Sequence, residues 1–308
     1  MVMGSSIKSL KTPLRYPGGK SRACKKMDPY IPDLRDYDSY YEPFLGGGSV
    51  AIHITKKYPH LKINVSDLYE PLYNFWVCLQ KRGEQMAGEL KELKSSYSTP
   101  DLAKELFLES KKIINDEDKS RLDRAIAFYV VNKCGFSGLT ESSSFSESAS
   151  NNNFSLRAIQ HLHAYQQLIQ RWRIVNFNYS RLMGEVYWTA NRRPFIYLDP
   201  PYDINDNLYG KKGEMHKKFD HDDFATYCEN FRAKLLISYN SDQLVKKRFK
   251  DWNVAEFDLT YTMRSVGEYM REQKSRKELL IFNYNIEEQI NGRGTTTNGL
   301  IRRYEEIK

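Results

Sequence analysis

The stretch RPFIYLDPPY, residues 193–202, predicts an apolar strand that ends abruptly at a carboxylate, two prolines and an aromatic ring. The four apolar residues 195–198 have the length of a short buried strand. Pro200 and Pro201 lack a backbone N–H, so neither can extend a hydrogen-bonded ladder. Asp199 and Pro200 therefore offer oxygen acceptors at a rigid strand end, beside the ring of Tyr202.

This corner suits a flat ligand that carries an exocyclic amino group. Two acceptors can bind its two N–H bonds, and the Tyr202 ring can stack on its face. In open α/β sheets, ligands bind outside the carboxyl ends of the strands, which is where this corner is expected. The alternative for residues 199–202 alone is a proline turn with a solvated aspartate.

A second motif, YYEPFLGGGSVAI at residues 40–52, predicts a strand end, a glycine turn and the start of a helix. Gly46, Gly48 and Ala51 fit the pattern G-x-G-x-x-A, in which a nucleotide approaches the amides of a helix N-terminus. The next predicted strand, KINVSD, ends in Asp67, where a carboxylate can bind ribose hydroxyls. These features predict a cofactor that contains adenosine, without saying which one.

A third motif, PLRYPGGKS at residues 13–21, predicts a turn that presents Tyr16 and Lys20. Its GKS sequence is shared with phosphate-binding P-loops. That motif requires a glycine at position 14, where this chain has Leu14, so the turn is not a P-loop. A surface turn with a solvated lysine is the alternative.

Four motifs in order, YPGGK, EPFLGGGSV, SD and DPPY, resemble those of the Dam-type (alpha-group) DNA adenine methyltransferases. The resemblance covers roughly residues 13–285. It implies S-adenosyl-L-methionine as methyl donor, no metal, and an adenine flipped out of double-stranded DNA. It assigns catalysis to Asp199, Pro200 and Tyr202. It assigns cofactor contacts to Tyr16, Lys20, Phe44, Gly46, Gly48, Asp67 and Asp199.

Other functions leave part of this pattern unexplained. Methylation of cytosine N4, or of adenine in RNA, would use the same corner. A nicotinamide-dependent oxidoreductase would explain the glycine turn and Asp67, but not DPPY or YPGGK. A non-catalytic DNA-binding protein would explain only the net charge of +8, which favours a polyanionic partner.

The order of predicted elements favours one fold class. Apolar strands at 172–177, 235–240, 254–261 and 278–284, with a helix at 242–249, predict a mostly parallel sheet that closes with a late hairpin. The resemblance implies an α/β fold: a Rossmann-like S-adenosylmethionine-dependent methyltransferase sheet with an inserted, mainly helical target-recognition domain. We expect the catalytic domain at 1–78 and 168–288, the insert at 79–167 and a C-terminal tail at 289–308.

The insert is the expected site of DNA reading. After its predicted amphipathic helices comes a segment rich in Ser, Gly and Asn, which fits either a base-reading element or a loop. The predicted DNA contacts are Lys133, Phe136, Ser137, Thr140, Arg264 and Lys274. Basic clusters at 15–26 and 264–277 are further candidates for phosphate contacts, or are solvated surfaces. Relatives that read GATC carry an arginine after Asn-Gly-Leu; here residues 137–141 read SGLTE, so the resemblance does not extend to a GATC target.

The remaining sequence features concern the cellular setting. The chain has no run of 18 apolar residues, and its four cysteines are widely separated. We therefore expect a cytoplasmic protein of a prokaryotic or phage-infected cell, with no membrane contact and a cognate restriction endonuclease as a possible partner.

Overall fold

The computed structural model describes residues 7–16, 18–136, 141–188, 193–202, 219–258 and 277–286. Within these ranges, strands form one sheet in the order β3-β2-β1-β4-β5-β7-β6. β7 runs antiparallel to β5 and β6, and the other pairs are parallel, which confirms the mostly parallel sheet with a late hairpin. The bounds are β1 (Ser39–Glu42), β2 (Lys62–Ser66), β3 (Arg173–Val175), β4 (Pro194–Leu198), β5 (Lys234–Asn240), β6 (Asn253–Asp258) and β7 (Lys277–Phe282).

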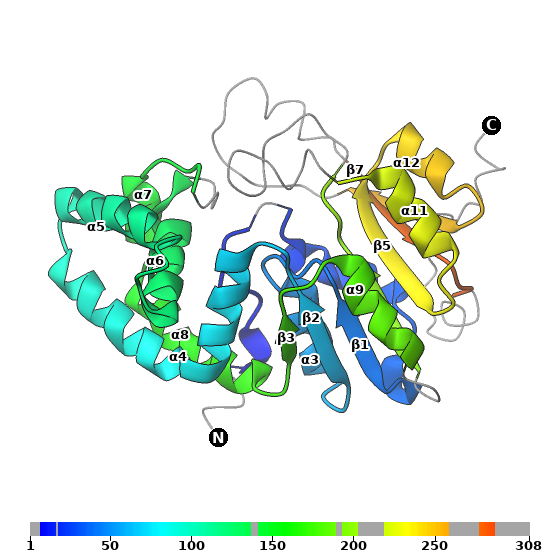
Figure 1. Cartoon of the computed structure of the whole chain (residues 1–308), viewed down its shortest axis with the longest axis horizontal. Helices are drawn as coiled ribbons and strands as arrows, with labels where there is room; N and C mark the ends of the chain where they lie inside the picture. The colour runs from blue at the N-terminus through cyan, green and yellow to red at the C-terminus, as the bar shows by residue number, and fades with distance from the viewer. Residues whose placement is uncertain are drawn as a thin grey trace.

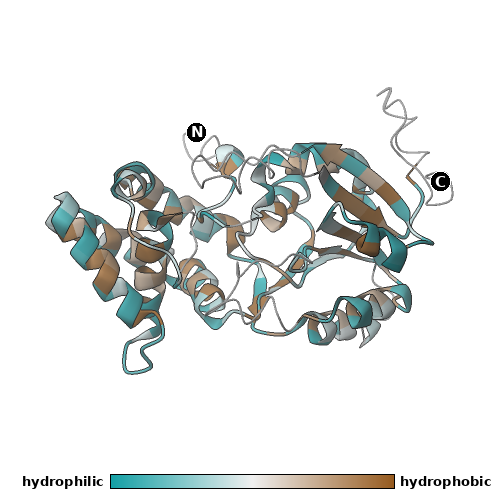
Figure 2. Cartoon of the chain, turned by 90° about the horizontal axis from the view of Figure 1, so that it is seen from above, coloured by the Kyte–Doolittle hydropathy of each residue, from teal (hydrophilic) through white to brown (hydrophobic). Residues whose placement is uncertain are grey.

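Apolar side chains cover both faces of the sheet. Along β4, Phe195 and Tyr197 belong to one buried cluster, and Ile196 and Leu198 to a second. Successive side chains of a strand point to opposite faces, so an uninterrupted apolar run is what a doubly covered strand requires. Figure 2 shows the strands largely in brown and the outer sides of the helices largely in teal. Helix α3 (Ser49–Lys57) contributes to the first cluster, and α9 (Tyr179–Gly184), α11 (His221–Glu229) and α12 (Gln243–Arg248) contribute to the second.

Between β2 and β3 the chain forms a group of helices beside the sheet, on the left in Figure 1. The start of one of them shows why the sequence folds this way: Ser120 and Asp123 exchange side-chain to backbone hydrogen bonds in a capping box. The expected boundary at 78/79 falls inside the first helix, so this helix joins the sheet to the group. The helices are α4 (Glu70–Ser96), α5 (Pro100–Ile113), α6 (Arg121–Cys134), α7 (Glu147–Asn153) and α8 (Leu156–Ile169).

Further short helical segments lie along the described chain. They are η1 (Lys20–Arg22), α2 (Cys24–Met27), η2 (Asp28–Tyr30), η3 (Leu34–Asp36) and η5 (Glu185–Trp188). Of the helices in the described part of the chain, none combines the length and the apolar character needed to cross a membrane.

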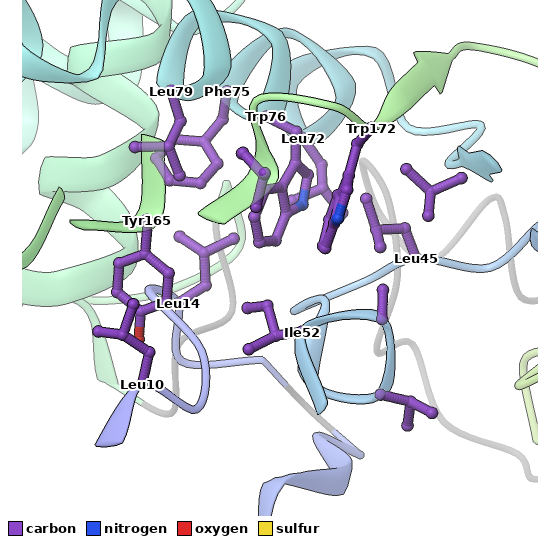
Figure 3. Close-up of a cluster of buried hydrophobic side chains, with 14 of the residues drawn as sticks. Leu10, Leu14, Leu45, Ile52, Leu72, Phe75, Trp76, Leu79, Tyr165 and Trp172 are labelled. Carbon is purple, nitrogen blue, oxygen red and sulfur yellow. The ribbon is translucent and has the colours of Figure 1, made fainter. Parts of the chain in front are cut away.

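Two tryptophans pack beside the turn that follows β1 (Figure 3). The ring centroids of Trp76, from α4, and Trp172, just before β3, lie 5.8 Å apart. Both side chains are buried, and the indole N–H of Trp172 donates to the Thr55 hydroxyl of α3 at 2.9 Å. This packing ties three elements together and gives the glycine turn a rigid support.

Candidate active site

The carboxyl ends of β1 and β4 meet where the strand order changes direction. From β1 the sheet continues through β2 and β3 on one side and through β4 and β5 on the other. Tyr41 of β1 lies opposite Ile196 of β4 in the parallel register, so Glu42 and Asp199 follow at the same edge. Open α/β sheets bind ligands at such a switch point. The structure thus brings the glycine turn and the DPPY corner together.

The glycine turn has a backbone that favours glycine. Gly46 and Gly48 have φ angles of 49° and 67°, in the left-handed region. A Cβ on Gly48 would lie 2.6 Å from Trp76 Cζ2, so the ring leaves no space for a side chain. The same indole donates through Nε1 to the Gly46 carbonyl oxygen at 3.0 Å. Gly48 is also the N-cap of α3, which places backbone amides at the edge of the site.

Asp67 connects the end of β2 to the glycine turn. Its Oδ2 accepts the Gly46 N–H at 2.9 Å and its Oδ1 accepts the Tyr69 N–H at 3.0 Å. Burial raises the pKa of this carboxyl to about 6, and the two N–H donors oppose the shift. Because each carboxylate oxygen can accept about two hydrogen bonds, both oxygens retain a position for a ribose hydroxyl.

The Lys20 ammonium reaches from the N-terminal turn into the DPPY corner. Its Nζ donates to both Asp199 carboxylate oxygens at 2.9 Å and to the Tyr202 hydroxyl at 2.7 Å. Lys20 is only 3 % exposed. The alternative of a solvated lysine is therefore wrong, and so is a phosphate contact from this side chain. A buried cation of this kind requires carboxylate partners to offset its desolvation.

The corner retains two oxygen acceptors. Ser238 Oγ donates to Asp199 Oδ1 at 2.7 Å, which adds to the two bonds from Lys20. A carboxylate offers about four acceptor positions, so Oδ2 keeps one. Among the described residues, no donor binds the carbonyl oxygen of Pro200. Two acceptors at one strand end are what the amino group of a flat ligand needs.

A cavity of about 190 Å³ opens at this edge. The Tyr16 ring lies against the glycine turn, and Phe44 stacks on Tyr179 at a centroid distance of 5.7 Å. Aromatic faces, backbone amides and carboxylates together fit a ligand with a flat base, ribose hydroxyls and a positive charge. All the residues predicted to contact the cofactor line this one cavity: Tyr16, Lys20, Phe44, Gly46, Gly48, Asp67 and Asp199.

The predicted DNA contacts are only partly described. Phe136 is exposed after the end of α6, at 36 %. Lys133 differs from the expectation for a phosphate contact, because it is 8 % exposed and its ammonium lies 5.2 Å from the centroid of the Tyr129 ring. Burial lowers the pKa of Lys133 to about 8. Ser137, Thr140, Arg264 and Lys274 lie outside the described residues.

A buried amide links α6 to the YPGGK turn. Asn132 is fully buried; its Oδ1 accepts the Arg15 N–H at 2.9 Å, and its Nδ2 donates to the Arg15 carbonyl at 2.6 Å. The Arg15 guanidinium donates to the Gly135 carbonyl at 2.7 Å. The segment that ends at Phe136 is therefore bonded directly to the turn that carries Tyr16 and Lys20.

Some residues of the site were not among those predicted. Ser238 on β5 and Glu278 on β7 belong to distant strands, although a polar residue within each apolar run was a usable signal. Glu42, at the end of β1, lines the cavity and accepts the Tyr40 hydroxyl at 2.6 Å. Burial raises the pKa of Glu42 well above its usual range, and the charge of Asp199 adds to this effect. Nothing in the sequence pointed to the bracing role of Trp76.

A mostly parallel sheet with a glycine turn at its switch point and a DPPY corner beside it defines a methyltransferase that acts on an amino group. Residues 16–263 match the family of D12 class N6 adenine-specific DNA methyltransferases. The chain belongs to this family, which confirms the resemblance found in its motifs.

Curated relatives agree with this assignment. The chain is 24% identical over 293 residues to the type II methyltransferase M.MjaIII of Methanocaldococcus jannaschii, covering 88% of this chain and 98% of that one. It is 21% identical over 287 residues to the type II methyltransferase M1.LlaDCHI of Lactococcus lactis subsp. cremoris, covering 88% and 94%. It is also 24% identical over 246 residues to the DNA N-6-adenine-methyltransferase of Escherichia phage P1, covering 77% and 31%. The chain is thus an adenine-specific DNA methyltransferase, not an oxidoreductase or a non-catalytic DNA-binding protein.

Proposed function

We propose that this enzyme methylates adenine N6 at a specific site in double-stranded DNA, with S-adenosyl-L-methionine in the cavity and the flipped-out target base at the DPPY corner. The observation that carries the proposal is the position of Asp199, which belongs to both the cavity and the corner. A base inside a duplex cannot reach this edge of the sheet. Its extrusion costs a few kcal/mol.

The residues around the cavity divide the binding of the donor among them. Asp67 binds the ribose hydroxyls, and the turn at Gly46 and Gly48 lets the ligand approach backbone amides. Tyr16 and Phe44 offer π faces to a cation. When bound, S-adenosylmethionine supplies the methyl group.

The corner orients the acceptor nitrogen. Asp199 Oδ2 and the Pro200 carbonyl oxygen accept the two N6 protons, and the Tyr202 ring stacks on the base. This arrangement directs the nitrogen lone pair into the cavity, so catalysis rests on positioning and electrostatics. As the nitrogen bonds to the methyl carbon, the bond from that carbon to the sulfonium sulfur of the donor would break and leave a neutral thioether. The nitrogen then loses a proton to water, because this proton becomes acidic only after methylation. No separate base and no metal are required.

Recognition of the DNA sequence is assigned to the helical insert at 79–167, and the transfer reaction to residues 1–78 and 168–288. Phe136 is exposed, and its segment is hydrogen-bonded to the YPGGK turn. Among the described residues it is therefore the best placed to contact bound DNA. The printed names of the relatives, type II methyltransferases, suggest a modification enzyme. A cognate restriction endonuclease in the same prokaryotic or phage-infected cytoplasm is therefore the proposed partner.

The test is transfer of labelled methyl from S-adenosylmethionine to unmethylated genomic DNA, followed by nucleoside analysis and mapping of the modified positions. We expect N6-methyladenine in one short sequence. Failure to label DNA while the protein still binds the donor would refute the DNA substrate. Failure to bind the donor would refute the assignment of the cavity.

Two carboxylate-to-amide variants make the test specific. D199N is expected to abolish transfer, because it places an N–H donor in the corner that must accept. D251N, at an exposed position on the turn before β6, is the matched control and is expected to keep wild-type activity. A D199N enzyme that retained wild-type turnover would contradict the proposed role of Asp199.

A further inference from the structure

The DPPY corner contains a second buried carboxylate, contributed by the antiparallel strand β7. Glu278 is 2 % exposed. Its backbone lies in the middle of three strands, opposite Asn240 of β5 and Phe257 of β6. The backbone of a residue in the middle strand of three has little freedom to move, so the point from which its side chain extends is well defined.

The side chain of Glu278 contacts groups of the corner. Its Oε1 accepts the Tyr202 hydroxyl at 2.7 Å and lies 3.3 Å from Lys20 Nζ. The Tyr202 oxygen in turn accepts a hydrogen bond from Lys20 at 2.7 Å. The phenol is therefore fixed as both donor and acceptor. Glu278 and Lys20 together therefore fix the position of the hydroxyl end of the Tyr202 ring.

Among the described residues, the corner holds more carboxylates than ammonium groups. One buried ammonium, that of Lys20, faces the carboxylates of Asp199 and Glu278. Two carboxylates facing one cation give this described part of the corner excess negative charge, and the side chains of Lys20 and Glu278 are buried there. Such a field favours positive charge that develops nearby, and it acts more strongly than it would in solvent. The exocyclic nitrogen becomes more positive as it forms its bond to the methyl carbon.

We propose that Glu278 is a positioning residue for methyl transfer: it anchors the hydroxyl end of the Tyr202 ring on which the flipped base stacks, and it supplies a second carboxylate to the corner. This inference rests on the proposed function of the corner. It adds a residue from outside the four motifs, 76 positions beyond Tyr202 in the sequence. Glu278 acts through Tyr202 and Lys20 and is not required to touch the substrate.

Two substitutions separate the hydrogen bond from the charge. E278Q keeps the size of the side chain and an oxygen acceptor for the Tyr202 hydroxyl, but it removes the negative charge. E278L removes both. The matched control is E256Q on the neighbouring strand β6, where Glu256 pairs with Lys246 and accepts the Ser241 hydroxyl, outside the residues that line the cavity.

The measurements are made on the full chain with unmethylated DNA: kcat, KM for the DNA, donor affinity by calorimetry, and thermal unfolding. For E278Q, we expect kcat to fall about 10- to 100-fold, up to the roughly 100-fold loss that a misplaced active-site group can cause. Donor affinity and unfolding temperature should stay close to those of E256Q. E278L is expected to lose more. A kcat for E278Q within twofold of the control would overturn the proposal.

A double variant tests the route through Tyr202. Y202F removes the hydroxyl that Glu278 holds, so Y202F combined with E278Q is expected to lose less activity than the product of the two single losses. Fully multiplicative losses would overturn the inference that Glu278 acts through this hydroxyl. Activity that falls only in step with unfolding or donor binding would assign Glu278 to the framework of the protein instead. If the wild-type enzyme itself labels no DNA, the proposed function fails before the role of Glu278 is tested.

Discussion

The contact between Gly48 and Trp76 allows a prediction whose size follows from the structure. In the variant G48A, the new Cβ would meet Trp76 Cζ2 at 2.6 Å and Cη2 at 2.7 Å. Trp76 is fully buried and cannot move aside freely. Overpacking of this kind costs about 1–3 kcal/mol, and a φ of 67° adds about 1 kcal/mol for a residue with a Cβ. The free energy of unfolding should therefore fall by about 2–4 kcal/mol.

The assay is thermal and urea unfolding of the full chain, combined with calorimetric titration of S-adenosylmethionine. The matched control is G88A, within helix α4, where a Cβ would meet nothing within 4 Å. That control is expected to raise stability by about 0.5–1 kcal/mol, because alanine is the better helix former. G48A should also weaken donor binding, since the turn it distorts lines the cavity.

A second substitution identifies the cause. W76F removes both ring atoms that would clash, so the pair G48A/W76F should be more stable than the sum of the single losses predicts, by about 1 kcal/mol or more. If G48A unfolds and binds the donor as the wild type does, the proposed fit between the turn and the indole is incorrect. An additive double variant would show that the two residues do not interact.

Further predictions follow from buried polar groups. Donor binding should weaken as pH falls through about 6, the raised pKa of Asp67, because the ribose hydroxyls donate to its charged form. Folded Asp67 keeps its proton up to about pH 6, whereas the unfolded chain releases it near the ordinary pKa of 3.8. The unfolding free energy should therefore fall as the pH rises from about 4 to 6, a slope absent in D67N. K133M should raise the unfolding temperature at pH 7 because it removes a buried charge, and unchanged DNA affinity would remove Lys133 from the recognition surface. N132L should cost about 2–5 kcal/mol in urea unfolding, because it leaves the Arg15 N–H and carbonyl oxygen unsatisfied. Methyl transfer should continue in EDTA, since the corner needs only acceptors; loss that is restored by a divalent metal would contradict this.

Much of the fold could be predicted because it depends on local sequence. Residues 195–198 are apolar without interruption, and the structure buries them on both faces of the sheet. The late hairpin of β6 and β7 likewise follows from two apolar runs near the end of the chain. The region around the glycine turn was predictable for a related reason, since the positive φ angles of Gly46 and Gly48 restrict the choice of residue at those positions.

The rest of the site depends on contacts between distant parts of the chain. Ser238 and Glu278 reach Asp199 and Tyr202 only because β5 lies next to β4 and β7 lies next to β5. No single segment of the sequence determines this strand order. The turn around Lys20 taken alone also allowed a solvated lysine, because the carboxylate partners of Lys20 lie far away in sequence. Lys133 differs from expectation in the same way: it is a basic residue before a polar segment, yet it is buried and packs on an aromatic ring. Burial of a charge is decided by tertiary packing and leaves no local signature.

The connection between β2 and β3 has an evolutionary consequence. The chain leaves the sheet after Ser66 and returns at Arg173, which pairs with Asn64 on the neighbouring strand. Departure and return are adjacent, so segments can be lengthened, shortened or exchanged between lineages without shifting the register of any other strand. Under the proposed role of the insert in reading DNA, descendants of one ancestral gene can in this way diverge in the sequence they mark while inheriting the same chemistry. Because departure and return lie on one pair of parallel strands, such changes leave the pairing of the rest of the sheet intact.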